Sequence, residues 1–130
     1  MKKIIQQINN ADRPIVYAGW GCTFYKQGFE KFVEKYSIPV MVSWRAIDLA
    51  PEADRPGMFN PIANEVLNEA DLLLVLGARI DDTLTNYDLA NFAKNAVKIV
   101  VDIDKAELDR LPEDYIKVNM DVGEFLREMI

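Results

Sequence analysis

The residues best suited to chemistry fall in three short segments, each at the end of a run of apolar residues. The segments are Gly19-Trp20-Gly21, Gly77-Ala78-Arg79 and Asp102-Ile103-Asp104. Glycine lets a backbone approach a phosphate group closely, and arginine offers a planar set of donors for phosphate or carboxylate. A carboxylate at the end of a strand can accept both hydroxyls of a ribose. Together, these residue types indicate nucleotide binding.

Each segment also has a simpler structural interpretation. Gly19-Trp20-Gly21 is not a full G-x-G-x-x-G motif, because Phe24 stands at the third glycine position, so it could be a tight strand-to-helix turn. Asp104 could act as the N-cap of a helix that starts at Lys105. Arg79 could form an ion pair with a nearby carboxylate, the candidates being Asp81, Asp82 and Asp102.

The remaining reactive side chains are two tryptophans, one cysteine and a pair of aspartates. Trp20 and Trp44 each follow a predicted strand, where an indole could stack on a flat ring or cover the edge of the sheet. Cys22 lies near a predicted helix N-terminus, which favours a thiolate, but the chain has no histidine to activate it. Asp81-Asp82 could contact a hard metal ion, yet no third ligand stands at a suitable spacing. We therefore predict no catalytic residue and no metal site.

The composition limits the classes of protein to which the chain can belong. Of its 130 residues 50% are hydrophobic, so residues 1–130 are expected to form one domain with its own core. A net charge of −6 without a Lys/Arg-rich stripe argues against nucleic acid and anionic membranes as partners. No apolar run resembles a signal peptide or a membrane span, and a single cysteine suits a reducing compartment. We therefore expect a cytoplasmic protein.

The elements that must position these residues alternate between helices and apolar strands. Leu72–Leu76 is a continuous apolar run, which is typical of a parallel strand covered by helices on both faces. Strands are expected at 15–18, 39–43, 72–76, 98–104 and 115–118, and helices at 2–10, 24–36, 61–70, 88–93, 105–111 and 122–129. This order predicts a Rossmann-like, doubly wound parallel α/β sheet with Leu72–Leu76 in its middle.

Local signals define parts of these elements. Asp121 is expected to cap the last helix, with Glu124 at its third position. Residues 44–61 are expected to be irregular and 77–87 to form a polar loop. In the helix at 24–36, the residues expected near one face are Phe24, Gly28, Phe32, Val33 and Tyr36. The carboxyl ends of the strands would then bring the three chemical segments to one edge.

The chain resembles the central domain of thiamine-diphosphate-dependent enzymes, and in particular that of acetohydroxyacid (acetolactate) synthases. The resemblance runs over nearly the whole chain, from Ala11 to the last helix. Its strongest parts are Ala63-Asn64-Glu65, Ala70 to Arg79, Asp81-Asp82, Phe92-Ala93, Ile99 to Asp104, Ala106-Glu107 and Asp121-Val122.

This resemblance implies a parallel sheet of five to six strands with helices on both faces. It also implies flanking domains that bind thiamine diphosphate and magnesium at a subunit interface in a full-length parent enzyme. The chain carries neither these domains nor the family's glycine-aspartate-glycine motif, so we expect it to be non-catalytic alone. It resembles an excised domain, a minimised domain or a free-standing relative, whose freed surfaces could support a homo-oligomer.

In acetohydroxyacid synthases the equivalent domain binds FAD without a redox role in the main reaction, and other members bind ADP-like nucleotides or no ligand. The resemblance therefore implies an FAD- or ADP-type ligand at the carboxyl edge of the sheet. Carried over by position, its binding residues would be Gly19, Gly21, Ser43, Trp44, Gly77, Ala78, Arg79, Asp81, Asp102, Ile103 and Asp121.

Several departures from the family pattern argue against retained FAD binding. Trp20 stands in place of a middle glycine, Thr83 in place of a second arginine, and Met120 in place of a glycine. The loop 51–62 is shorter than in the family, and only Gly57-Met58-Phe59 remains of a turn that would cover the ligand. A lost edge strand would leave five strands and a narrower cleft. The alternative is a purely structural or assembly scaffold without a ligand.

Overall fold

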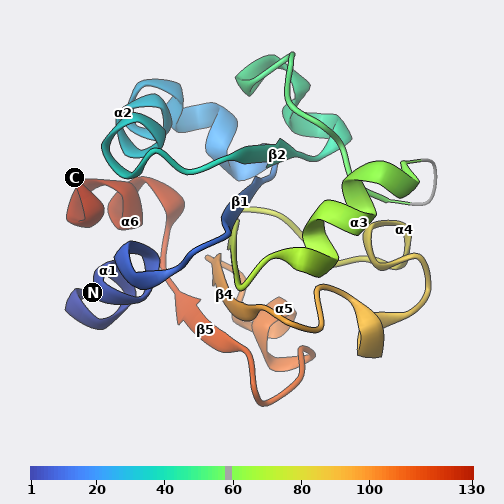
Figure 1. Ribbon diagram of the computed structural model, residues 1–130. Helices are drawn as coiled ribbons and strands as arrows, with labels where there is room; N and C mark the ends of the chain where they lie inside the picture. The colour runs from blue at the N-terminus through green and yellow to red at the C-terminus, as the bar shows by residue number, and fades with distance from the viewer. Residues whose placement is uncertain (58–59) are drawn as a thin grey trace.

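The computed structural model describes residues 1–57 and 60–130 and contains a five-stranded sheet (Figure 1). Its order is β2-β1-β3-β4-β5, and every neighbouring pair runs parallel. The doubly wound α/β fold and the central place of β3 are thereby confirmed. The strands are β1 (Pro14–Ala18), β2 (Val40–Val42), β3 (Leu72–Leu76), β4 (Val97–Asp102) and β5 (Ile116–Asn119).

Helices cover both faces of the sheet, and the two chain termini lie on the same side of the molecule (Figure 1). On that side lie α1 (Lys2–Asn10), α2 (Lys26–Tyr36) and α6 (Val122–Met129). On the opposite face lie α3 (Pro61–Glu69), α4 (Asp82–Thr85) and α5 (Lys105–Asp109). The connections also contain the 3-10 helices η1 (Trp20–Tyr25), η2 (Trp44–Leu49) and η3 (Leu89–Asn91).

The strand β3 is buried along its length because its side chains alternate between two apolar layers. Leu72, Leu74 and Leu76 belong to the layer that packs against α1, α2 and α6. Leu73 and Val75 belong to the layer on the opposite face. All five side chains are 2% exposed or less. Burial of one leucine side chain stabilises the folded state by about 1.5–3 kcal/mol. Because the side chains of β3 are buried in both layers, this strand stabilises the packing on both faces of the sheet.

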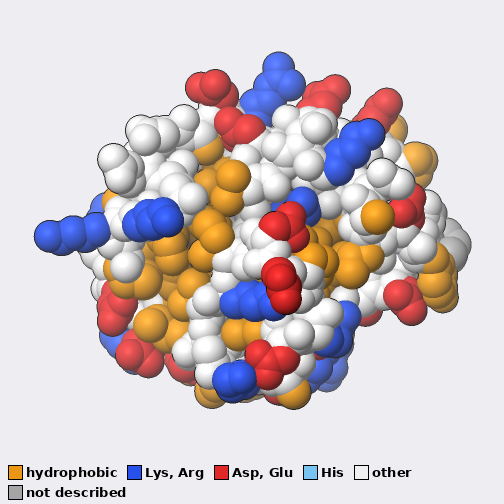
Figure 2. All heavy atoms as spheres, turned by 90° about the horizontal axis from the view of Figure 1, so that it is seen from below, with side chains coloured by type: hydrophobic (Ala, Val, Ile, Leu, Met, Phe, Trp, Pro, Cys, Tyr) orange, Lys and Arg blue, Asp and Glu red, His pale blue; other side chains and the backbone are white. Residues whose placement is uncertain are grey.

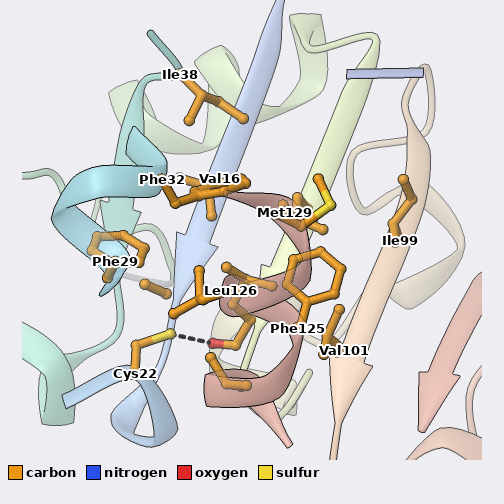
Figure 3. Close-up of a cluster of buried hydrophobic side chains, with 14 of the residues drawn as sticks. Val16, Cys22, Phe29, Phe32, Ile38, Ile99, Val101, Phe125, Leu126 and Met129 are labelled. Carbon is orange, nitrogen blue, oxygen red and sulfur yellow. Dashed lines mark hydrogen bonds between the residues drawn. The ribbon is translucent and has the colours of Figure 1, made fainter. Parts of the chain in front are cut away.

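Figure 3 shows the first of these layers, where α2 and α6 meet over the sheet. The rings of Phe32 on α2 and Phe125 on α6 have centroids 6.5 Å apart. The Sγ of Cys22 donates a hydrogen bond to the carbonyl oxygen of Leu76 at 3.2 Å. Cys22 therefore fixes η1 against the end of β3.

The chain reverses its direction of travel through the sheet between β1 and β3. After β1 it moves outward to β2, and it then crosses to the other side of β1 to form β3. Ligands of open α/β sheets bind outside the carboxyl ends of the strands at such a switch point. Here the turns after the two strands touch, because the Gly19 N–H donates to Leu76 O at 2.9 Å and the Gly21 N–H to Gly77 O at 3.2 Å.

One isolated bridge lies beside β2. Met41 and Asp54 form this parallel bridge, and the Val42 N–H donates to Asp54 O at 3.0 Å. The sheet of the described residues thus has five strands, and the expectation that a sixth strand has been lost stays a prediction. In the turn Gly57-Met58-Phe59, the last two residues lie outside the described residues.

The helix predicted from Phe24 begins later and presents a different face. Residues Trp20–Tyr25 form η1, and α2 starts at Lys26. The Phe24 side chain is 63% exposed, so its predicted place near the packed face is wrong. Phe29 is buried there together with Phe32. The change from a 3-10 to an α-helix rotates the helical face, which a single period cannot anticipate.

Other connections contain short helices where sequence signals were weak. Trp44–Leu49 forms η2 within the stretch predicted as irregular. The predicted polar loop contains α4, whose N-cap Asp81 accepts the Leu84 N–H at 2.8 Å. The helix predicted at 88–93 is reduced to η3, and the Asp88 carboxylate accepts a hydrogen bond from the Asn91 side chain rather than from a backbone N–H.

The edge strand β5 is only partly covered. Ile116 and Val118 are half-buried and pack against the first apolar layer. Figure 2 shows the face below β5 in Figure 1, on which hydrophobic side chains gather in two areas with charged side chains between them. Charges near an edge strand disfavour pairing with another chain. Within the described ranges, no helix has the length and apolar character needed to cross a bilayer.

Replacing Gly19 by alanine is predicted to destabilise the protein by about 1–3 kcal/mol, because the new Cβ would overlap Ala78 Cβ and Gly77 O. Gly28→Ala is the matched control, since its Cβ would lie 3.8 Å from Leu126 Cβ. We expect this helical change to stabilise by about 0.5–1 kcal/mol. Urea unfolding followed by circular dichroism measures both. A Gly19→Ala variant as stable as the parent would contradict the tight turn contact.

Candidate functional site

Two adjoining pockets lie at the carboxyl edge of the sheet. The first, which we call the η2 pocket, is about 320 Å³ and is lined by Ser43, Trp44, Gly77, Ala78, Arg79 and Asp81 among others. The second, the β4 pocket, is about 300 Å³ and is lined by Gly21, Gly77, Arg79, Asp102, Ile103 and Asp121 among others. The structure thus collects nearly all predicted binding residues around two hollows, each near the lower size limit of small-molecule sites.

Gly19 is the predicted residue that lines neither pocket. It lies beneath them in the contact between the β1 and β3 turns, where its N–H pairs with Leu76 O. Gly21 lines the β4 pocket, but its N–H already donates to Gly77 O. Gly77 has a φ of +59°, in the left-handed region that glycine tolerates best. These glycines therefore serve a close backbone contact, which is the structural interpretation of the motif.

Arg79 forms ion pairs, but not with the carboxylates predicted from the sequence. Its Nη2 lies 3.0 Å from Asp104 Oδ2 and its Nη1 lies 3.3 Å from Glu107 Oε2. The predicted partners Asp81, Asp82 and Asp102 form no ion pair with it in the described structure. Asp104 and Glu107 are favoured because α5 starts directly after β4 and faces the β3 turn.

Glu107 is the residue at this edge whose role sequence reasoning missed. Its side chain is only 3% exposed, and it accepts hydrogen bonds from Arg79, Arg110 and the Ile80 N–H. A buried carboxylate needs such partners to offset its lost hydration. The spacing of Glu107 and Arg110, three residues apart on one helix, was the available signal.

The two aspartates after β4 have separate roles. Asp104 accepts the Ala106 N–H at 3.0 Å, which confirms the predicted N-cap of α5. The Arg79 guanidinium, which donates to Asp104, lowers the pKa of that carboxyl group. Asp102 is 9% exposed, and burial raises its pKa above the ordinary value of an aspartate. One oxygen of Asp102 accepts the Asp104 N–H at 2.8 Å, and the other has no hydrogen-bond partner among the described residues.

Asp121 closes the far end of the β4 pocket. It accepts the N–H groups of Gly123 and Glu124 at 2.8 and 3.3 Å, which confirms it as the N-cap of α6. The Tyr25 hydroxyl donates to its other oxygen at 3.0 Å, and this hydrogen bond raises the pKa of Tyr25. A Cβ on Gly123 would overlap the Tyr25 ring, so glycine allows this contact.

Both tryptophans near the pockets carry an arginine on their rings. Arg45 lies 4.9 Å from the ring centroid of Trp20, and Arg55 lies 4.4 Å from that of Trp44. Such contacts contribute about 0.5–1 kcal/mol at exposed sites. The Trp20 ring also meets Phe24 edge-on, with centroids 4.8 Å apart. Trp20 is therefore held on two sides, while 48% of it stays exposed.

The structure places Cys22 in an environment that suppresses its reactivity. Burial raises the pKa of the thiol to about 12, so the expectation that a helix N-terminus favours its thiolate is wrong. Asp81 is engaged as the N-cap of α4. Among residues 1–57 and 60–130, no three His, Cys, Asp or Glu side chains are grouped so that they could hold a metal ion. The Cys22 thiol is thus buried, and Asp81 is engaged in capping a helix.

Comparison with known proteins places these features in a family. Residues 1–129 match the sequence model described as "Thiamine pyrophosphate enzyme, central domain". The chain is 35% identical over 129 residues to acetolactate synthase isozyme 1 large subunit of Escherichia coli (strain K12), covering 95% of this chain. It is 34% identical over 135 residues to probable acetolactate synthase 2, chloroplastic, of Oryza sativa subsp. japonica, covering 99%. It spans only 23% and 20% of the lengths of these relatives.

Removal of the Glu107 carboxylate tests the ion-pair cluster around α5. We predict that Glu107→Ala loses about 2 kcal/mol, because Arg79, Arg110 and the Ile80 N–H lose a buried acceptor. Asp109→Ala is the control on the same helix, since the ion pair of Asp109 with Lys105 is exposed. Its loss should lower the free energy of unfolding by less than about 0.5 kcal/mol. Urea unfolding measures both, and equal losses would show that the cluster is not stabilising.

Proposed function

We propose that this chain, which belongs to the thiamine pyrophosphate enzyme central-domain family, is a non-catalytic domain that binds an ADP-containing nucleotide at the carboxyl edge of its sheet. On this proposal residues 1–130 form one domain. Its partners would be flanking domains that hold thiamine diphosphate and magnesium in an acetolactate synthase-like parent. The described residues contain no group of three His, Cys, Asp or Glu side chains that could hold a metal ion.

The observation that carries this proposal is the convergence of polar groups at the switch point of the sheet. The turns after β1, β3, β4 and β5 all reach the β4 pocket. Asp102 lies at the end of β4, and one of its carboxylate oxygens has no hydrogen-bond partner in residues 1–57 and 60–130, so it would accept the ribose hydroxyls. Phe24 and Ile103 line the same pocket and are 63% and 71% exposed, so they would flank an adenine ring.

Arg79 would hold the diphosphate, because it lines both pockets and its side chain is 64% exposed. A guanidinium has five N–H donors, and its hydrogen bonds to Asp104 and Glu107 use one on each of two nitrogens. The remaining donors can face a ligand without breaking the cluster. Ser43, Trp44, Ala78 and Asp81 belong to the η2 pocket and would contact a larger ligand only.

The second candidate is a structural or assembly scaffold without a ligand. It is favoured by the N–H groups of Gly19 and Gly21, which pair with the β3 turn and are not free for a phosphate. The capping role of Asp121 also favours the scaffold, since both carboxylate oxygens of Asp121 already accept hydrogen bonds within the protein. In this case surfaces freed from flanking domains would support a homo-oligomer. A cytoplasmic location, which the single cysteine favours, belongs to either proposal.

Ligand binding separates the two candidates. We expect ADP at a hundredfold excess over its dissociation constant to stabilise the protein by about 2.7 kcal/mol in a thermal melt. Asp102→Asn should weaken ADP binding about tenfold or more, because a charged acceptor for the ribose is lost. Asp109→Asn is the matched control, since Asp109 is exposed and pairs with Lys105 outside both pockets.

Two outcomes would contradict nucleotide binding at the β4 pocket. If ADP, FAD and NAD all leave the melting temperature unchanged, and the purified protein has no flavin absorbance, the scaffold is the correct function. If ADP binds equally to the parent, Asp102→Asn and Asp109→Asn, the ligand lies elsewhere and the β4 pocket is not its site.

A further inference from the structure

Trp20 stands between the two pockets of the carboxyl edge. It lines both the η2 pocket and the β4 pocket, as Gly77 and Arg79 also do. The Gly21 N–H donates to Gly77 O at 3.2 Å, so the turns after β1 and β3 are hydrogen-bonded to each other beside these pockets. A ligand that occupied both pockets would therefore have to pass the indole ring.

The indole is held in this place from two sides. The edge of the Phe24 ring meets it at a centroid distance of 4.8 Å and an interplanar angle of 80°. The Arg45 guanidinium from η2 lies 4.9 Å from its ring centroid. Phe24 lines the β4 pocket and Arg45 lines the η2 pocket, so each pocket contributes one contact. The Trp20 ring is thus contacted by one residue of each pocket, and we call this ring the partition.

We propose that Trp20 determines the size of nucleotide that this edge accepts. The β4 pocket, at about 300 Å³, takes a mononucleotide such as ADP, and the partition excludes a dinucleotide whose second half must reach the η2 pocket. This inference rests on the proposed nucleotide binding. On this inference Trp20 sets the class of nucleotide that binds, whereas Asp102 and Arg79 hold the nucleotide.

Isothermal titration of the 130-residue chain with ADP and with FAD tests the partition. We expect the parent to bind ADP at least tenfold more tightly than FAD. Trp20→Ala should tighten FAD binding and so bring the dissociation constant for FAD at least tenfold closer to that for ADP. Arg45→Ala, which loosens one side of the ring, should shift the ratio in the same direction by a smaller factor.

Tyr87→Ala is the matched aromatic control, because Tyr87 is 71% exposed and lines neither pocket. Its ratio of FAD to ADP affinity should equal that of the parent. If ADP binds but Trp20→Ala leaves the ratio unchanged, or the parent binds FAD as tightly as ADP, the partition is overturned and the proposed function stands. If no variant binds ADP, the proposed function fails and this inference fails with it. Circular dichroism of each variant confirms that it is folded.

Discussion

The contact between the turns after β1 and β3 is the constraint on which the rest of this structure depends. Two N–H groups of the first turn, those of Gly19 and Gly21, extend the hydrogen bonding of the sheet past its last paired residues. A side chain at Gly19 would overlap the β3 turn. Two pockets lie at this switch point, and Trp20, Gly77 and Arg79 line both of them.

The acidic edge of the sheet is explained first by folding and only then by binding. Asp81, Asp104 and Asp121 each accept backbone N–H groups at the start of the following helix. Such caps stabilise a helix by about 0.5–2 kcal/mol and place negative charge at the positive end of its dipole. Asp102 differs, since its carboxylate has one hydrogen-bond partner in the described part of the chain, the Asp104 N–H. It is therefore the aspartate of this edge that best retains capacity for a ligand.

The fold was predictable because its signals are long and apolar, whereas the details of the site depend on where short elements turn. The run Leu72–Leu76 favoured a buried central strand, and its neighbours followed from the alternation of helices and strands. Which carboxylates pair with Arg79 depends on how α5 leaves β4, and no local pattern contains that angle. The burial of Phe29 in place of Phe24 likewise follows from η1, a 3-10 segment without a sequence signature of its own.

Amide NMR spectra of the ¹⁵N-labelled chain, recorded during titration with ADP, test the central claim most directly. The account predicts saturable shifts confined to the turns after β1, β3 and β4, including the amides of Gly21, Gly77 and Ile103, with α3 and α1 unaffected. Spectra that do not change, or shifts that gather on another face of the molecule, would contradict a nucleotide site at the carboxyl edge of this sheet.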